Sequence, residues 1–119
     1  MTKATQRVMI VDDDPDIRET LAELLHDEGF DVATAANGVE ALDLLASGPL
    51  PNVILLDMMM PVMNGFEFRL AQKMAEELAP IPVLIITAGA DHRAGEMDAA
   101  AVLRKPLNLP RLLEAIRTC

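Results

Sequence analysis

Side chains that could do chemistry stand where the short apolar runs of this chain end. Asp12 and Asp13 come directly after the first run, and Asp57 comes after the third. Thr87 closes the fourth run and Lys105 follows the fifth. If these runs are parallel strands, their carboxyl ends meet at one edge of a sheet, where ligands bind in open α/β folds. We therefore expect three carboxylates, a hydroxyl and an ammonium group to lie together.

Such a cluster of acids is unfavourable unless positive charge sits among them. The predicted ligands are oxygen atoms, with no thiol or imidazole nearby, and this set selects a hard cation. Mg²⁺ binds one or two carboxylates and completes its shell with water and phosphate oxygens. A magnesium ion, a lysine and a hydroxyl are the groups that stabilise a transferring phosphoryl group. The residues therefore indicate phosphoryl transfer to or from a carboxylate.

The elements that must position these residues are short apolar runs that alternate with longer amphipathic stretches. A continuous run of about four apolar residues is typical of a strand buried on both faces. The predicted strands are 8–11, 31–35, 53–56, 83–86 and 101–104. Because parallel strands need helical crossovers, and these are right-handed, the sequence predicts a doubly wound α/β fold with five helices on both faces of one sheet.

Local residues indicate where the helices begin. Asp14 is the predicted N-cap of the first helix, with Pro15 in its first turn, and Asn64-Gly65 begins the third. We expect the third helix to run until Pro80 stops it. Its predicted apolar face consists of Phe66, Leu70, Met74 and Leu78.

Composition limits the function further. The chain has 119 residues, the size of one domain, and shows no linker, so we predict one domain over 1–119 with its core at about 7–117. The net charge of −9 argues against binding to a nucleic acid backbone or an anionic membrane. The single cysteine excludes an internal disulfide and fits a reducing, cytoplasmic compartment. No apolar run approaches the roughly 18 residues of a membrane span.

Four motifs, in this order, together resemble the response-regulator receiver domain of two-component signalling, in its stand-alone, chemotaxis-regulator-like form. The resemblance extends from about Arg7 to Arg117. It implies a flavodoxin-like (βα)5 fold with a five-stranded parallel sheet in the order 2-1-3-4-5. The motifs are Val-Asp12-Asp13-Asp14, Leu-Leu-Asp57-Met-Met-Met-Pro61-x-Met-Asn-Gly65, Thr87-Ala88 and Lys105-Pro106.

The resemblance also implies roles for individual residues. Asp57 would accept a phosphoryl group from a sensor histidine kinase or a histidine phosphotransfer protein. Asp12, Asp13, Asp57 and the backbone carbonyl of Met59 would bind Mg²⁺. The protein would be a signalling switch and not a turnover enzyme, since it would catalyse only its own phosphorylation and dephosphorylation.

Two further residues of the resemblance concern the phosphoryl group itself. Thr87 would donate a hydrogen bond to it in the active state. Lys105 would pair first with Asp57 and then with a phosphoryl oxygen, and the bond from Lys105 to Pro106 would be cis. The downstream partner is not identified by the sequence.

The chain departs from the family pattern in the region from Thr87 to Leu107. Receivers usually carry an aromatic residue three positions before the lysine, where this chain has Val102, and Leu107 replaces another aromatic. Thr87 and Lys105 are 18 positions apart, about one helical turn fewer than the family pattern. We therefore expect a shortened fourth helix between about Gly89 and Ala100.

Two other functions stay open. A degenerate receiver could act as a constitutive interaction scaffold, which Val102 and the short fourth helix favour. A small phosphatase of the haloacid-dehalogenase type is the less favoured alternative, because Asp12-x-Asp14 after an apolar strand superficially matches its nucleophile motif. We assign no catalytic role to the remaining candidates: Asp14 and Asp16 as helix-start acids, His26 and His92 as solvent-facing residues, and Met58, Met59, Met60 and Met63 as loop packing.

Overall fold

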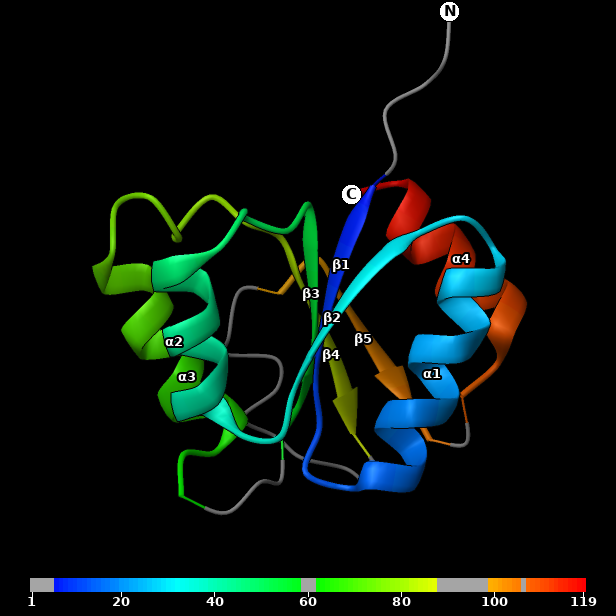
Figure 1. The fold of residues 1–119 in the computed structure, drawn as a ribbon, viewed down its shortest axis with the longest axis horizontal. Coiled ribbons are helices and arrows are strands. Elements are labelled where there is room, and N and C mark those ends of the chain that lie inside the picture. The colour runs from blue at the N-terminus through cyan, green and yellow to red at the C-terminus, as the bar shows by residue number, and fades with distance from the viewer. Residues whose placement is uncertain (1–5, 59–61, 88–98, 106) are drawn as a thin grey trace, which may run out of the picture.

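In a computed structural model of the chain, which describes residues 6–58, 62–87, 99–105 and 107–119, five parallel strands form one sheet. The strands are β1 (Arg7–Val11), β2 (Asp31–Ala35), β3 (Val53–Asp57), β4 (Val83–Thr87) and β5 (Ala101–Arg104). The helices in the described residues are α1 (Pro15–Asp27), α2 (Gly38–Ser47), α3 (Gly65–Met74) and α4 (Leu109–Arg117). The sheet order is β2-β1-β3-β4-β5, which confirms the predicted flavodoxin-like order (Figure 1).

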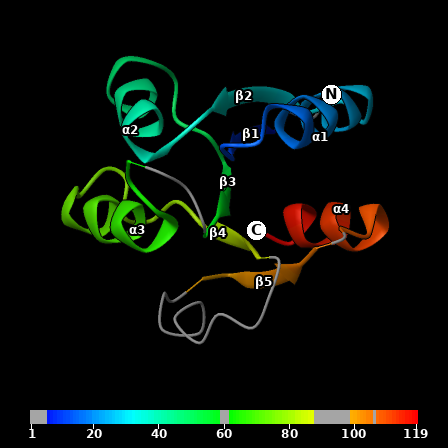
Figure 2. The same cartoon turned by 90° about the horizontal axis from the view of Figure 1, so that it is seen from below.

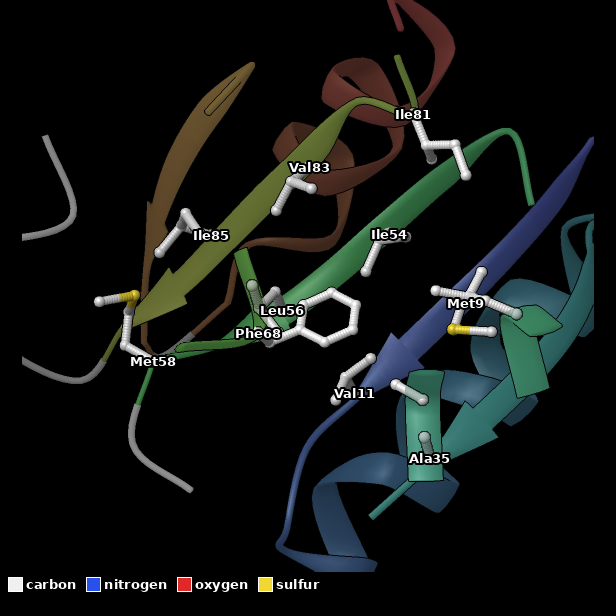
Figure 3. Packing of buried hydrophobic residues seen from close by; sticks show 12 residues of the cluster. Met9, Val11, Ala35, Ile54, Leu56, Met58, Phe68, Ile81, Val83 and Ile85 are labelled. Atoms are coloured by element: carbon white, nitrogen blue, oxygen red, sulfur yellow. The ribbon is translucent and has the colours of Figure 1, made fainter. Parts of the chain in front are cut away.

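Helices cover both faces of the sheet, as right-handed crossovers require. Helices α2 and α3 lie on one face, and α1 and α4 lie on the other (Figures 1 and 2). Along each central strand, successive side chains alternate between two apolar clusters. Met9, Ile54 and Ile85 pack under α2 and α3 around Phe68 (Figure 3), whereas Ile10 and Leu55 face α1 and α4. This alternation explains why the strands read as continuous apolar runs.

The register of the strands brings the predicted functional residues to one edge. Val11 pairs with Leu56, so the residues that follow β1 lie beside Asp57 at the end of β3. Asp57 pairs with Ile86, which places Thr87 just beyond it on β4. Thr87 in turn pairs with Arg104, the residue before Lys105.

The helix starts follow the predictions. The Asp14 side chain caps α1 by accepting hydrogen bonds from the backbone N–H groups of Asp16 and Ile17, and Pro15 is the first helical residue. The Asn64 side chain caps α3 and forms a reciprocal capping box with Glu67.

The prediction of which face of the third helix packs against the core is wrong. Helix α3 ends at Met74, six residues before Pro80, and Leu70 and Met74 are 51% and 89% exposed. The face turned to the core carries Phe68 and Gln72, both fully buried. Of the other two predicted positions, Leu78 follows α3 and is half-buried, and the Phe66 side chain lies outside the described residues.

The physical reason is a polar residue at a core position. The Gln72 side-chain amide donates to the carbonyl oxygens of Leu78 and Ile81, at 2.8 and 3.0 Å, and its own oxygen accepts from Arg69 at 2.8 Å. The bond to Ile81 satisfies a backbone carbonyl in the segment after α3, and the Leu78 carbonyl, which also accepts from the Ile81 N–H at 3.1 Å, receives a second bond. A hydrophobicity pattern assigns glutamine to the surface, and so it selected the opposite face.

Several predictions lie outside the described residues. They are most of the shortened fourth helix, the Met59 carbonyl, His92 and the bond to Pro106. Helix α4 is therefore the helix predicted as the last one, with Pro110 in its first turn and Arg117 in its last. Within the described part of the chain, no helix is long and apolar enough to cross a membrane.

Candidate functional site

Three carboxylates converge at the carboxyl edge of the sheet. Asp12, Asp13 and Asp57 each offer one carboxylate oxygen, and these oxygens all lie within 4.8 Å of one another. Asp12 and Asp57 are buried, at 1% and 5% exposure, whereas Asp13 is exposed and opens the cluster to solvent. The predicted grouping of acids at the ends of β1 and β3 is therefore present in the structure.

Lys105 places its ammonium group between two of these acids. Its Nζ lies 3.6 Å from Asp12 Oδ2 and 3.8 Å from Asp57 Oδ2. The residue is anchored by its backbone N–H, which donates to the carbonyl oxygen of Thr87 at 2.8 Å. One ammonium facing three carboxylates leaves net negative charge at the site, so the site is electrostatically suited to a further cation.

The two oxygens of the Asp12 carboxylate have different partners: one accepts a hydrogen bond, and the other has only the Lys105 ion pair among the described residues. Its Oδ1 accepts a hydrogen bond from the Asp14 backbone N–H at 2.9 Å. Its Oδ2 is buried and faces the Lys105 ammonium at 3.6 Å, but it has no hydrogen-bond partner among the described residues. A buried carboxylate oxygen without a hydrogen bond is costly unless a ligand satisfies it. With oxygen donors alone in the cluster, the residues fit a hard divalent cation such as Mg²⁺.

Arg18 supports this site, although no motif in the sequence assigns it a role. Its Nη1 donates to the backbone carbonyl oxygen of Asp12 at 2.8 Å. The backbone N–H of Asp12 donates to Ala35 at 3.1 Å, so both sides of this residue's backbone are fixed. A signal was present, because a positive side chain early in a helix opposes the helix dipole and calls for a specific partner.

Gly65 lets helix α3 begin directly against β3. Its backbone N–H donates to the Met58 carbonyl oxygen at 3.1 Å. A Cβ atom at this position would lie 2.7 Å from the Asp57 carbonyl oxygen and 2.9 Å from the Met58 Cα atom. From the sequence, Gly65 is predicted as the start of a helix and as part of a receiver motif, and the structure adds this close approach as its physical role.

The other candidates lie as follows. Thr87 is buried at the end of β4, on the same edge as Asp57. Val102 is 43% exposed on β5. His26 is exposed, as expected, and Met58 and Met63 pack in or against the apolar cluster of Figure 3, which supports their role in loop packing.

Relatives of this chain are response regulators. The family model of the response regulator receiver domain matches residues 8–117. The response regulator MprA of Mycobacterium sp. (strain KMS) is 37% identical over 115 residues, which are 93% of this chain and 49% of that protein. The MprA of Mycobacterium tuberculosis (strain ATCC 25177 / H37Ra) shows the same identity and coverage. The chain thus spans about half the length of these curated relatives.

Solved structures agree with this assignment. The chemotaxis response regulator CheY4 of Vibrio cholerae is 34% identical with a TM-score of 0.87, covering 97% of this chain and 98% of its own. A response regulator receiver protein from Pseudomonas putida has a TM-score of 0.91 over 99% of this chain and 100% of its own. At 23% identity that second likeness shows the fold alone. With its family match, its sheet order and its acidic edge, this chain belongs to the response regulator receiver domain family.

Proposed function

We propose that this chain is a phosphorylation-controlled switch in which Asp57 accepts the phosphoryl group. One observation carries the proposal: the buried Asp57 carboxylate lies 3.8 Å from the Lys105 ammonium and within the acidic cluster. A carboxylate oxygen of Asp57 would attack the phosphorus of a phosphohistidine. A P–O bond forms as the P–N bond breaks, the electron pair of that bond stays on nitrogen, and the histidine ring, already protonated on its other nitrogen, leaves as neutral imidazole.

The surrounding residues suit this transfer. Asp12, Asp13 and Asp57 would hold Mg²⁺, with the Met59 carbonyl as a further ligand by family resemblance. The bound ion would supply charge stabilisation for the phosphoryl oxygens. Lys105 would pair with a phosphoryl oxygen, and Thr87 would donate its hydroxyl hydrogen to another.

We propose a sensor histidine kinase or a histidine phosphotransfer protein as the phosphodonor. A predominantly apolar groove of about 420 Å³ borders the site and includes Lys105 itself. Leu24 is 38% exposed at this groove. A donor whose apolar side chains dock there would bring its phosphohistidine to the acidic edge. The groove is lined by Asp16, Ile17, Thr20, Leu21, Leu24, Lys105 and Leu107.

The product of this reaction is a modified protein, so the chain is a signalling domain and not a turnover enzyme. Phosphorylation would change its contacts with a downstream protein. Val102 cannot report that change as an aromatic ring would, since it has no ring to bury. We therefore keep a constitutive scaffold as the competing function.

The test is incubation of the full chain with acetyl phosphate, with and without Mg²⁺, followed by intact-protein mass spectrometry. We expect a gain of one phosphoryl group that needs Mg²⁺ and is absent in Asp57→Asn. A gain that persists in Asp57→Asn would contradict the assignment. No gain, together with equal partner affinity with and without beryllofluoride, would favour the scaffold, and steady turnover of a phosphate ester would favour the phosphatase.

A further inference from the structure

Helix α3 exposes an apolar stripe to solvent. Leu70 and Met74 are one turn apart, and they are 51% and 89% exposed. Single exposed apolar residues are ordinary on protein surfaces, but contiguous ones mark interaction sites. Met74 is the last residue of α3, and the next residue, Ala75, lines a hollow.

The hollow is a groove of about 470 Å³ between the end of α2 and the segment after α3. Its lining residues are Leu42, Leu45, Ala46, Ala75, Glu76, Glu77 and Leu78. Leu45 is buried in the apolar cluster of Figure 3, and Leu42 and Leu78 pack against it. The Gln72 amide donates to the Leu78 carbonyl at 2.8 Å, so a part-buried hydrogen bond fixes the wall formed by this segment.

The charge around the groove is negative. Glu76 and Glu77 line it directly, and both are exposed. Helix α2 and the described segment 62–80 together expose five acidic side chains and one basic side chain. The acids are Glu40, Asp43, Glu67, Glu76 and Glu77, and the base is Lys73. A partner with basic residues would be attracted by this field, whereas another copy of a chain with a net charge of −9 would be repelled.

The groove lies far from the acidic edge of the sheet. Helices α2 and α3 run antiparallel to the strands, so their carboxyl ends lie where the strands begin (Figure 1). The segment after α3 is at the top of that view, and the carboxyl ends of β4 and β5 point to the bottom. A molecule in the groove would therefore leave Asp57 open to a phosphodonor.

We propose that this groove docks a basic amphipathic helix of a partner protein. Its apolar side chains would fill the space between Leu42 and Leu78 and cover Met74, and its lysine or arginine residues would face Glu76 and Glu77. Apolar anchors at helical spacing in a hydrophobic groove are a common mode of recognition, and an exposed methionine adapts easily to such anchors. The contact does not depend on the phosphorylation proposed above.

The first test uses the full chain and a synthetic helical peptide of leucine and lysine, with the leucines on one face. A peptide of the same composition in shuffled order, without an apolar face, is the control. We expect methyl NMR shifts at Leu42, Leu45 and Leu78 with the amphipathic peptide only. Equal binding of both peptides, or shifts confined to other faces, would overturn the proposal.

Two sets of variants sharpen the test. Glu76→Lys with Glu77→Lys should weaken peptide binding by about tenfold. The matched control, Glu19→Lys with Glu23→Lys, makes the same charge change on the exposed side of α1 and should change binding by less than about twofold. If both double variants lost peptide affinity equally, the peptide would be bound by the overall negative charge of the chain and not by the groove, and the proposal would be wrong.

Leu70→Ser with Met74→Ser should also weaken binding, and the fold should persist because both side chains are exposed. The same double variant tests the competing occupant. If analytical ultracentrifugation shows that the parent chain is a dimer and that this variant is a monomer, a second copy covers the stripe and the proposal is wrong.

Discussion

Gly65 lies against Asp57 so closely that a Cβ atom at residue 65 would stand 2.7 Å from the Asp57 carbonyl oxygen. The start of α3 and the proposed phosphoacceptor are therefore coupled through their backbones. Any residue with a side chain at position 65 must move one of them.

Gly65→Ala should destabilise the fold by about 1–3 kcal/mol, because the atoms it meets are backbone and cannot rotate away. It should also slow phosphorylation of Asp57, since the carboxylate shifts with its backbone. Chemical denaturation and acetyl phosphate labelling measure the two effects. Gly38→Ala is the control: its Cβ would meet Met63 Sδ, Cγ and Cβ at 2.7, 2.8 and 3.0 Å, all side-chain atoms, of which the two closest can rotate away. If both variants lowered the free energy of unfolding and the phosphorylation rate by equal amounts, residue 65 would not be specifically coupled to Asp57.

Lys105 competes with any cation for Asp12 and Asp57, from which it stands 3.6 and 3.8 Å away. Lys105→Met should tighten Mg²⁺ binding by about fivefold, which corresponds to ~1 kcal/mol for a partly exposed ion pair. The same variant should slow phosphorylation by about a hundredfold, because a group that stabilises the transferring phosphoryl is lost. Calorimetry and labelling rates separate these opposite effects.

Lys105→Arg keeps the positive charge and serves as the control for Mg²⁺ affinity. We expect it to bind Mg²⁺ as the parent does. If Lys105→Met bound Mg²⁺ no more tightly than the parent, the ammonium group would not be acting on the cation site.

Removing the Arg18 side chain should weaken Mg²⁺ binding, whereas removing the Lys105 side chain should tighten it. Arg18 is positively charged, so a purely electrostatic role predicts that its removal strengthens cation binding. We expect Arg18→Met to weaken Mg²⁺ binding by about fivefold, because the lost hydrogen bond to the Asp12 carbonyl, worth about 1 kcal/mol, frees the backbone that aims the carboxylate. Tighter binding in a calorimetric titration would exclude the positioning role, and Arg18→Lys should fall between the parent and Arg18→Met.

Gln72, which lies away from the acidic edge, should contribute to the free energy of unfolding. Gln72→Leu keeps similar bulk but removes the donors to Leu78 and Ile81 and the acceptor of Arg69. Leaving these buried groups without that partner should cost about 2–4 kcal/mol in the free energy of unfolding. Urea denaturation measures this cost. Leu70→Ala, on the exposed face of the same helix, should change stability by less than about 0.5 kcal/mol.

Local chemistry accounts for the predictions that were confirmed. The central strands β1, β3 and β4 read as apolar runs because helices cover both of their faces. The caps at Asp14 and Asn64 need only a side chain that reaches N–H groups two or three residues on. The meeting of Asp12, Asp13 and Asp57 followed from one rule, that parallel strands share a carboxyl edge.

Non-local contacts account for the predictions that failed or were not made. The buried position of Gln72 depends on two carbonyls, six and nine residues away, that no periodicity reveals. The roles of Arg18 and Gly65 likewise depend on atoms of other elements, which the register of the sheet brings within contact.

The sequence by itself thus determined the order of the five strands, the identity of the acidic edge and the family, because these depend on residue type and spacing along one chain. Only the tertiary structure decided which face of α3 is buried, that Asp12 Oδ2 lacks a hydrogen-bond partner among the described residues, and that Glu76 and Glu77 line a groove after α3. The physical reason is that burial and polar satisfaction are properties of packed surfaces, and a packed surface exists only when distant segments meet.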